Sequence, residues 1–139
     1  MEIPSVNCKL KVGDNWRWTM NFLVVDDNSS VRYVVSSIIK LFGHGTDEAN
    51  DGLEAIQKLR ENQYDVVITD AEMPNVDGAE LCKIVKSETP GVYIIGISGS
   101  PSSLDGLKEA GADICLSKPF SMHALKEAIG DRFRSSRLT

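Results

Sequence analysis

The sequence has no excess of positive charge. Its 15 Lys and Arg residues are outnumbered by 20 Asp and Glu, which gives a formal net charge of -5 at pH 7. Proteins that bind nucleic acid need clustered Lys and Arg to neutralise phosphates, so this balance argues against a nucleic-acid partner. Positive charge gathers only near the carboxyl end, at Arg132, Arg134 and Arg137. We interpret that segment as a solvated helix end.

Cysteine is scarce, and long apolar runs are missing. The three cysteines, Cys8, Cys82 and Cys115, form no CxxC pair and have no histidine nearby at metal-ligand spacing, which suits reduced thiols in a reducing compartment. No run approaches the roughly 18 apolar residues of a membrane span, and residues 1–19 contain no signal-peptide-like run. We therefore expect no membrane insertion by this chain and a cytoplasmic or nuclear location.

The chain also lacks internal repeats and low-complexity segments. Its 139 residues, of which 42% are apolar and 25% charged, match one soluble domain with room for a sizeable core. We expect an amino-terminal extension over 1–19, a domain over 20–134 and a short tail over 135–139. In the extension, Trp16 and Trp18 are interpreted as a hydrophobic tether onto the domain.

Short apolar runs alternate with helix-spaced segments. Five runs are typical of strands, and five segments between and after them place apolar residues at helical spacing. The predicted strands cover residues 22–25, 45–49, 66–69, 92–98 and 114–117. The predicted helices begin at Asn28 or Ser29, before Leu53, near Gly78, before Leu104 and after Ser121. This alternation predicts an α/β fold: a doubly wound five-stranded parallel sheet with helices on both faces.

Polar side chains follow four of these strands at their carboxyl ends. Asp26 and Asp27 end the first strand, Asp70 the third, Ser98 the fourth and Lys118 the fifth. In open α/β sheets, ligands bind outside the carboxyl ends of the strands. The sequence therefore predicts three carboxylates, a hydroxyl and an ammonium at one edge.

This set of groups predicts a metal-assisted phosphoryl site. Three neighbouring carboxylates repel one another unless their pKa values rise or a cation binds them. Ligands that are all oxygen favour Mg²⁺, or Mn²⁺ as an alternative, and Mg²⁺ also accepts phosphate oxygens. Lys118 could neutralise one phosphoryl oxygen and Ser98 could hydrogen-bond another, which leaves one carboxylate as a nucleophile.

Four motifs carry a resemblance to a known family. VVDDN, ITDAEMPNVDG, ISGS and LSKPF, in this order between about residues 20 and 133, are similar to those of the CheY-like receiver domains of two-component response regulators. The resemblance implies a flavodoxin-like strand order 2-1-3-4-5. It also implies a His-to-Asp phosphorelay, in which a histidine kinase or histidine phosphotransfer protein is the partner and autodephosphorylation ends the signal.

The resemblance assigns a role to each residue of the acidic edge. It implies that Asp70 accepts a phosphoryl group from phosphohistidine, and that Asp26, Asp27 and Asp70, with the backbone carbonyl of Glu72, hold Mg²⁺. Ser98 and Lys118 would bind the phosphoryl group and relay its presence.

The same resemblance suggests details of the surrounding loops. It implies a cis Lys118–Pro119 bond, which X-Pro sequences accommodate at low cost, and space beside the phosphoryl group at Gly99. Asp77 and Gly78 are interpreted as turn and helix-start residues without a catalytic role.

Two features depart from the family pattern. Many receivers carry Tyr or Phe three positions before the lysine, whereas this chain has Cys115, so the aromatic side chain whose rotation reports phosphorylation in those receivers is replaced here. Glu72 and Ser100 occupy positions that tune water access to the phosphoryl group.

The EMP and CLSKP stretches are more similar to those of phosphorelay receivers of hybrid kinases and small plant-type regulators than to those of bacterial transcription factors. With nothing after Thr139, we expect a stand-alone relay or phosphate sink, or a receiver excised from a hybrid kinase.

Three alternatives remain open at the level of sequence. A haloacid dehalogenase-type hydrolase also uses an Asp nucleophile and Mg²⁺, but DDNSS does not match its DxDx[TV] motif. A flavodoxin-like phosphate binder is disfavoured because two aspartates in the first loop would repel a bare phosphate. The third is a pseudo-receiver, which would bind partners without phosphoryl chemistry.

Overall fold

The computed structural model contains the predicted α/β architecture. It describes the backbone of residues 8–12 and 15–138 and the side chains of residues 19–130. Five parallel strands form one sheet in the order β4-β3-β5-β6-β7. Their bounds are β3 Asn21–Val25, β4 Gly45–Ala49, β5 Val66–Asp70, β6 Tyr93–Ser98 and β7 Ile114–Ser117. Counted from β3 as the first strand, this is the order 2-1-3-4-5, so the predicted fold is confirmed.

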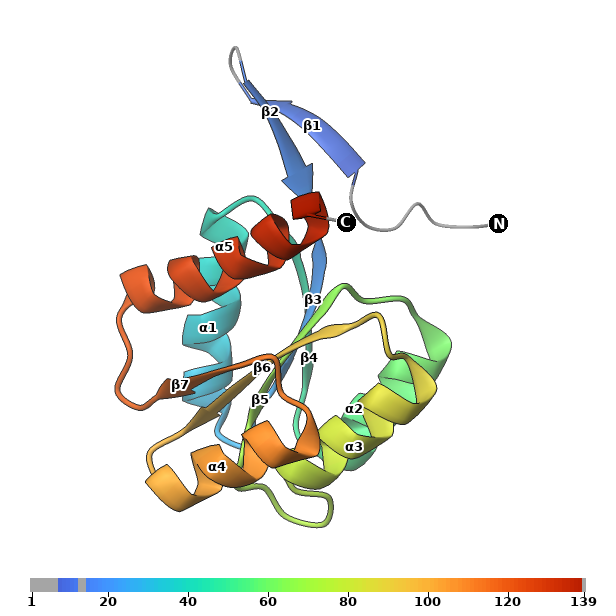
Figure 1. Ribbon diagram of the computed structural model, residues 1–139, viewed down its shortest axis with the longest axis vertical. Coiled ribbons are helices and arrows are strands. Elements are labelled where there is room, and N and C mark those ends of the chain that lie inside the picture. Colours follow the sequence, from blue (N-terminus) through green and yellow to red (C-terminus); the bar gives the residue numbers. More distant parts are fainter. Residues whose placement is uncertain (1–7, 13–14, 139) are drawn as a thin grey trace.

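Five helices cover the two faces of this sheet (Figure 1). They are α1 Ser29–Leu41, α2 Gly52–Glu61, α3 Gly78–Glu88, α4 Pro101–Ala110 and α5 Met122–Leu138. α1 and α5 pack on one face around Phe22 and Ile68, whereas α2, α3 and α4 pack on the other around Leu23 and Val67. β3 and β5 are buried on both sides, which is why their sequences are continuous apolar runs.

Side-chain caps start the helices at the edge where the strands end. Asn28 accepts from the backbone N–H groups of Ser30 and Val31, and Asp51 and Asp77 each accept from the residue three positions later. These contacts satisfy backbone N–H groups that a helix start would otherwise leave unpaired. The prediction that α1 begins at Asn28 or Ser29 is confirmed.

A hairpin precedes the domain and was not predicted. β1 Cys8–Val12 and β2 Asn15–Thr19 pair antiparallel, and β2 leads through Met20 into β3 (Figure 1). The side chains of Trp16 and Trp18 lie outside the described residues, as do those of the basic segment near the carboxyl end. Both interpretations stay predictions. Within the described chain, no helix combines the length and apolar character that crossing a bilayer requires.

Candidate functional site

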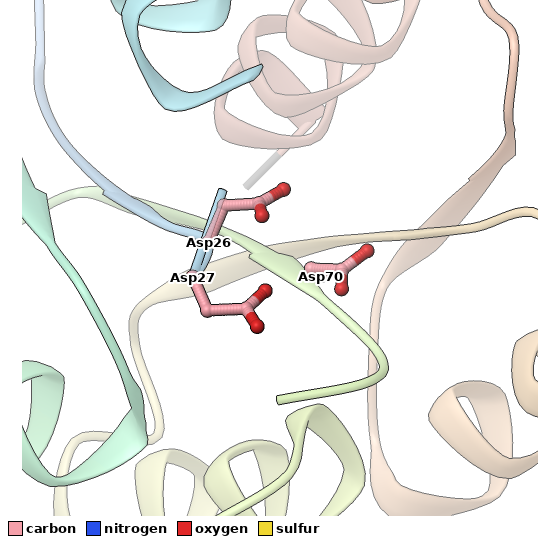
Figure 2. A group of neighbouring side chains, drawn as sticks. All are labelled: Asp26, Asp27 and Asp70. Atoms are coloured by element: carbon pink, nitrogen blue, oxygen red, sulfur yellow. The ribbon is translucent and has the colours of Figure 1, made fainter. Parts of the chain in front are cut away.

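Three carboxylates meet at the carboxyl edge of the sheet. Asp26 and Asp27 directly follow β3, and Asp70 is the last residue of the neighbouring strand β5. One carboxylate oxygen from each lies within 4.8 Å of the others. Figure 2 shows the three side chains grouped beyond the ends of these two strands. The sequence prediction that they lie together at one edge agrees with this arrangement.

The surroundings of Asp26 raise the pKa of its carboxylate. It is 5% exposed, and its Oδ1 accepts a hydrogen bond of 2.9 Å from the backbone N–H of Asn28. Burial raises its pKa, and the negative charges of Asp70 and Asp27 raise it further, against the lowering effects of the Asn28 hydrogen bond and the Lys118 charge. The net pKa is above the ordinary value, so the cluster holds excess negative charge at a cost in free energy.

Lys118 supplies the positive charge nearest to this cluster. Its Nζ lies 2.8 Å from Asp70 Oδ1 and 3.8 Å from Asp26 Oδ2. Burial lowers the pKa of Lys118, but the hydrogen bond to Asp70 and the neighbouring carboxylates raise it more. The side chain therefore stays an ammonium. The Lys118–Pro119 peptide bond is cis, as predicted.

Ser98 lies between Asp70 and Lys118 in the order of the sheet. It ends β6, is fully buried, and accepts a hydrogen bond of 3.0 Å from the backbone N–H of Ser100. Its own carbonyl accepts from the backbone N–H of Lys118 at 2.9 Å, which ties β6 to the strand that ends in the lysine. A Cβ added at Gly99 would meet only Lys118 Cβ, at 3.9 Å, so there is open space beside the lysine.

The loop from Ala71 to Asp77 closes the site on the β5 side. The backbone N–H of Glu72 lies 3.3 Å from Asp70 Oδ2, and the Glu72 carboxylate accepts a long hydrogen bond of 3.4 Å from Ser103 of α4. Gly78 starts α3 directly against Asp70, because a Cβ there would lie 2.3 Å from the Asp70 carbonyl oxygen. Only glycine fits this close approach. Asp77 caps α3, which agrees with its assignment as a helix-start residue.

Arg32 is a site residue that the sequence analysis missed. Its guanidinium donates to the Asp26 carbonyl oxygen at 2.7 Å and to Glu48 Oε1 at 3.0 Å. The only sequence feature that pointed to Arg32 is its place in the second turn of the helix that follows Asp26 and Asp27. That signal is weak, because the contact is with a backbone atom and with a residue of another strand.

Cys115 does not take part in this cluster. Its thiol, on β7, donates weakly to the Leu104 carbonyl oxygen at 3.8 Å, and burial raises its pKa. Cys82 is fully buried on α3, and burial raises its pKa to about 12. Neither thiol has the lowered pKa of a reactive cysteine, which agrees with a packing role for both side chains.

The donor set of the edge fits a hard divalent cation. Asp26, Asp27 and Asp70 offer only oxygen, and no histidine or cysteine joins the metal-ligating groups found among the described residues. Such ligands suit Mg²⁺ better than the softer transition metals. A cation bound there would also offset the mutual repulsion of the three carboxylates.

Comparison with known proteins identifies the family. The family model for the response regulator receiver domain matches residues 22–130. Sensor protein EvgS of Escherichia coli O157:H7 is 33% identical over 127 residues, which are 90% of this chain and 11% of EvgS. Sensor histidine kinase RcsC of Escherichia coli K12 is 32% identical over 140 aligned residues, 97% of this chain and 14% of RcsC. The chain therefore spans little more than a tenth of these relatives' length.

Solved structures agree with this match. The chemotaxis protein CheY4 of Vibrio cholerae has a TM-score of 0.75 and 31% identity, and the match covers 81% of this chain and 98% of CheY4. NtrX of Brucella abortus has a TM-score of 0.80 and 26% identity over 86% of this chain and 28% of NtrX. Together with the family model, these similarities show that the chain belongs to the response regulator receiver domain family of two-component systems.

Proposed function

We propose that this receiver domain is a phosphoacceptor in a His-to-Asp phosphorelay and that Asp70 is the residue phosphorylated. The observation that carries the proposal is the pairing of Asp70 with Lys118 at 2.8 Å beside two further carboxylates. A carboxylate that ends a buried strand is a fixed nucleophile, and the ammonium next to it is placed to meet the incoming negative charge.

The transfer step follows from these positions. An Asp70 carboxylate oxygen attacks the phosphorus of a phosphohistidine, the phosphorus–nitrogen bond breaks, and the departing imidazole keeps the electron pair and gains a proton. Lys118 then exchanges its contact with Asp70 Oδ1 for a phosphoryl oxygen. The buried Ser98 hydroxyl donates to another phosphoryl oxygen. Phosphoryl transfer depends mainly on such positioning and charge neutralisation.

Asp26, Asp27 and Asp70, with the backbone carbonyl of Glu72, would hold Mg²⁺, with Mn²⁺ as an alternative. Bound there, the metal supplies charge neutralisation for the carboxylates and for phosphoryl oxygens. The fit is supported by the all-oxygen donor set and by the proximity of the three carboxylates.

Autodephosphorylation would return the domain to its resting state. A water oxygen attacks the phosphorus, the bond from phosphorus to the Asp70 oxygen breaks, and phosphate and a proton are released. The Glu72 side chain reaches across to Ser103 of α4, and Ser100 lies next to Ser98. We propose that these side chains control the access of that water, so they would set whether the domain holds its signal or acts as a phosphate sink.

The partner we propose is a histidine phosphotransfer protein or a histidine kinase. Support comes from relatives that are named a sensor protein and a sensor histidine kinase. We propose action in the cytoplasm, where the free thiols of Cys82 and Cys115 fit a reducing environment.

A small phosphodonor tests the chemistry without a protein partner. The chain is incubated with phosphoramidate or acetyl phosphate, with Mg²⁺ or with EDTA, and its intact mass is followed over time. We expect the added mass of one phosphoryl group only with Mg²⁺, none in Asp70→Asn, and normal labelling in Asp105→Asn, which removes an exposed carboxylate of α4. A specific label that persists in Asp70→Asn would contradict the assignment of Asp70, and no label with any donor would support the pseudo-receiver instead.

A further inference from the structure

Arg32 joins three elements at the edge of the acidic cluster. From the second turn of α1 it donates through Nη1 to the Asp26 carbonyl oxygen at 2.7 Å and through Nε to Glu48 Oε1 at 3.0 Å. A longer contact of 3.5 Å runs from Nη1 to Asn50 Oδ1. Glu48 lies in β4 and Asn50 directly follows that strand, and the Arg32 side chain is only 16% exposed. The guanidinium therefore ties the loop after β3 to the end of β4.

The contact with Asp26 completes the anchoring of that residue. The backbone N–H of Asp26 donates to the Ala49 carbonyl oxygen at 3.2 Å, and its carboxylate accepts from the N–H of Asn28 at 2.9 Å. Its carbonyl oxygen is held by Arg32. All three polar groups of Asp26 are thus fixed, and of these three contacts only the one from Arg32 has a side-chain donor.

Glu48 and Asn50, which accept from Arg32 at the end of β4, are themselves held by residues of α2. Lys58 Nζ donates to the Glu48 carbonyl oxygen at 2.5 Å, and the backbone N–H of Asn50 donates to Glu54 Oε1 at 2.6 Å. The backbone of the two residues whose side chains accept from Arg32 is therefore fixed in turn. Such outer contacts orient metal ligands and affect how tightly the metal binds.

We propose that Arg32 is a positioning residue that sets the affinity of the acidic cluster for Mg²⁺ by holding Asp26 through its backbone carbonyl. The inference rests on the proposed function for the identity of the cation, and it does not require that Asp70 be phosphorylated.

The charge of Arg32 and its positioning role predict opposite changes in Mg²⁺ affinity when the residue is replaced. A guanidinium near three carboxylates repels a divalent cation, so if charge alone mattered, removing it would tighten Mg²⁺ binding. If positioning dominates, removing it weakens binding despite the charge. Lysine keeps the charge, but its single ammonium does not reproduce the planar fork that reaches Asp26 and Glu48 together. Arg32→Gln and Arg32→Lys therefore separate the two effects.

Calorimetric titration of the unphosphorylated chain with Mg²⁺ tests the proposal. We expect roughly tenfold weaker binding in Arg32→Gln, at the lower end of the usual range for residues that orient metal ligands, and a smaller weakening, about threefold, in Arg32→Lys. Arg60→Gln is the matched control. Arg60 makes a comparable pair of contacts with Glu88, at 3.0 and 2.7 Å, where α2 and α3 end, on the opposite edge of the sheet. It should leave Mg²⁺ affinity unchanged.

Circular dichroism and urea unfolding in EDTA check that each variant is folded, and Arg32→Lys is the fallback if Arg32→Gln does not fold. Unchanged or tighter Mg²⁺ binding in both folded Arg32 variants overturns the proposal, and so does an unmutated chain that binds no Mg²⁺. The phosphodonor assay separates the two claims. Arg32-dependent Mg²⁺ binding without labelling contradicts only the phosphoacceptor function, whereas normal labelling with Arg32-independent binding contradicts only the role of Arg32.

Discussion

Removing one carboxylate from the acidic cluster should stabilise the metal-free domain. In Asp26→Asn the amide oxygen can still accept from the backbone N–H of Asn28, while the negative charge of a residue that is 5% exposed disappears. The substitution relieves repulsion from Asp27 and Asp70 but also removes the attraction of Lys118. The sign of the net effect follows from the distances.

A simple estimate gives the magnitude. The three carboxylates lie within 4.8 Å of one another, and at that upper limit each of the two repulsions of Asp26 is worth about 0.9 kcal/mol at the dielectric constant of water and about 3.5 kcal/mol at an effective value of 20. The attraction of Lys118 at 3.8 Å is worth about 1.1 and 4.4 kcal/mol under the same conditions. The net repulsion is then roughly 0.6 to 2.5 kcal/mol. We expect Asp26→Asn to raise the free energy of unfolding by about 1 to 2 kcal/mol without metal.

Urea unfolding in EDTA and in saturating Mg²⁺ measures this effect. Ligand at 100 times its dissociation constant stabilises the folded chain by about 2.7 kcal/mol. The unmutated chain should gain that amount, and Asp26→Asn should gain much less. The order of stability therefore reverses between the two conditions. Asp105→Asn, which removes an exposed charge, should change stability by less than about 0.5 kcal/mol in both.

The pH dependence gives an independent check. Because the folded state raises the pKa of Asp26 above 3.8, the group favours folding at pH below that value, and this contribution is lost as pH rises through the folded-state pKa. The advantage of Asp26→Asn in EDTA should therefore shrink as pH is lowered from 7 towards 4. An Asn variant that is less stable than the unmutated chain in EDTA, or an advantage that grows on acidification, would refute the reasoning.

Three further predictions concern the core and the strand ends. Ser36→Ala should raise the free energy of unfolding by about 1 kcal/mol in urea, because the buried Ser36 hydroxyl has no hydrogen-bond partner among the described residues; a loss of stability would contradict this. Gly78→Ala should destabilise the domain by roughly 1 to 3 kcal/mol and weaken Mg²⁺ binding, because its Cβ would collide with the Asp70 carbonyl oxygen; wild-type values for both would contradict the close approach. Cys82 and Cys115 should react with a thiol reagent at pH 8 much more slowly than in urea, because burial raises both pKa values, and rapid labelling of the folded chain would count against it.

Strand positions were predictable because a parallel sheet buries both faces. Residues 22–25 and 66–68 are continuous apolar runs for this reason, and the polar residues that follow each run mark the carboxyl edge of the sheet. The order of the strands did not follow from this alternation. It came from the resemblance to receiver domains, because apolar periodicity carries no information about which strands are neighbours.

The hairpin shows a signal that was present but overlooked. Two short runs with high strand propensity, CKLKV and NWRWT, are separated by Gly-Asp, a pair typical of two-residue hairpin loops. The alternation was easy to miss because the two runs differ in phase. In CKLKV the first, third and fifth residues are apolar, whereas in NWRWT the second and fourth are.

Arg32 could not have been assigned from sequence. Its partners are a backbone carbonyl and a glutamate 16 residues later, and their proximity depends on β4 pairing beside β3. The strand-end aspartates were easier, because parallel topology alone brings the carboxyl ends of neighbouring strands together. Ser98 and Lys118 follow the same rule, one strand further along each time.

Transfer from a phosphorylated histidine phosphotransfer protein is the most direct test of the phosphoacceptor function. Radiolabelled donor is mixed with the chain, with Asp70→Asn or with Asp105→Asn, in Mg²⁺ and in EDTA, and the label on each protein is followed through transfer and decay. We expect Mg²⁺-dependent label on the unmutated chain and on Asp105→Asn, and none on Asp70→Asn. Equal labelling of Asp70→Asn, or no transfer to the folded, Mg²⁺-bound chain from several donors, would contradict the assignment of Asp70 as the phosphoacceptor.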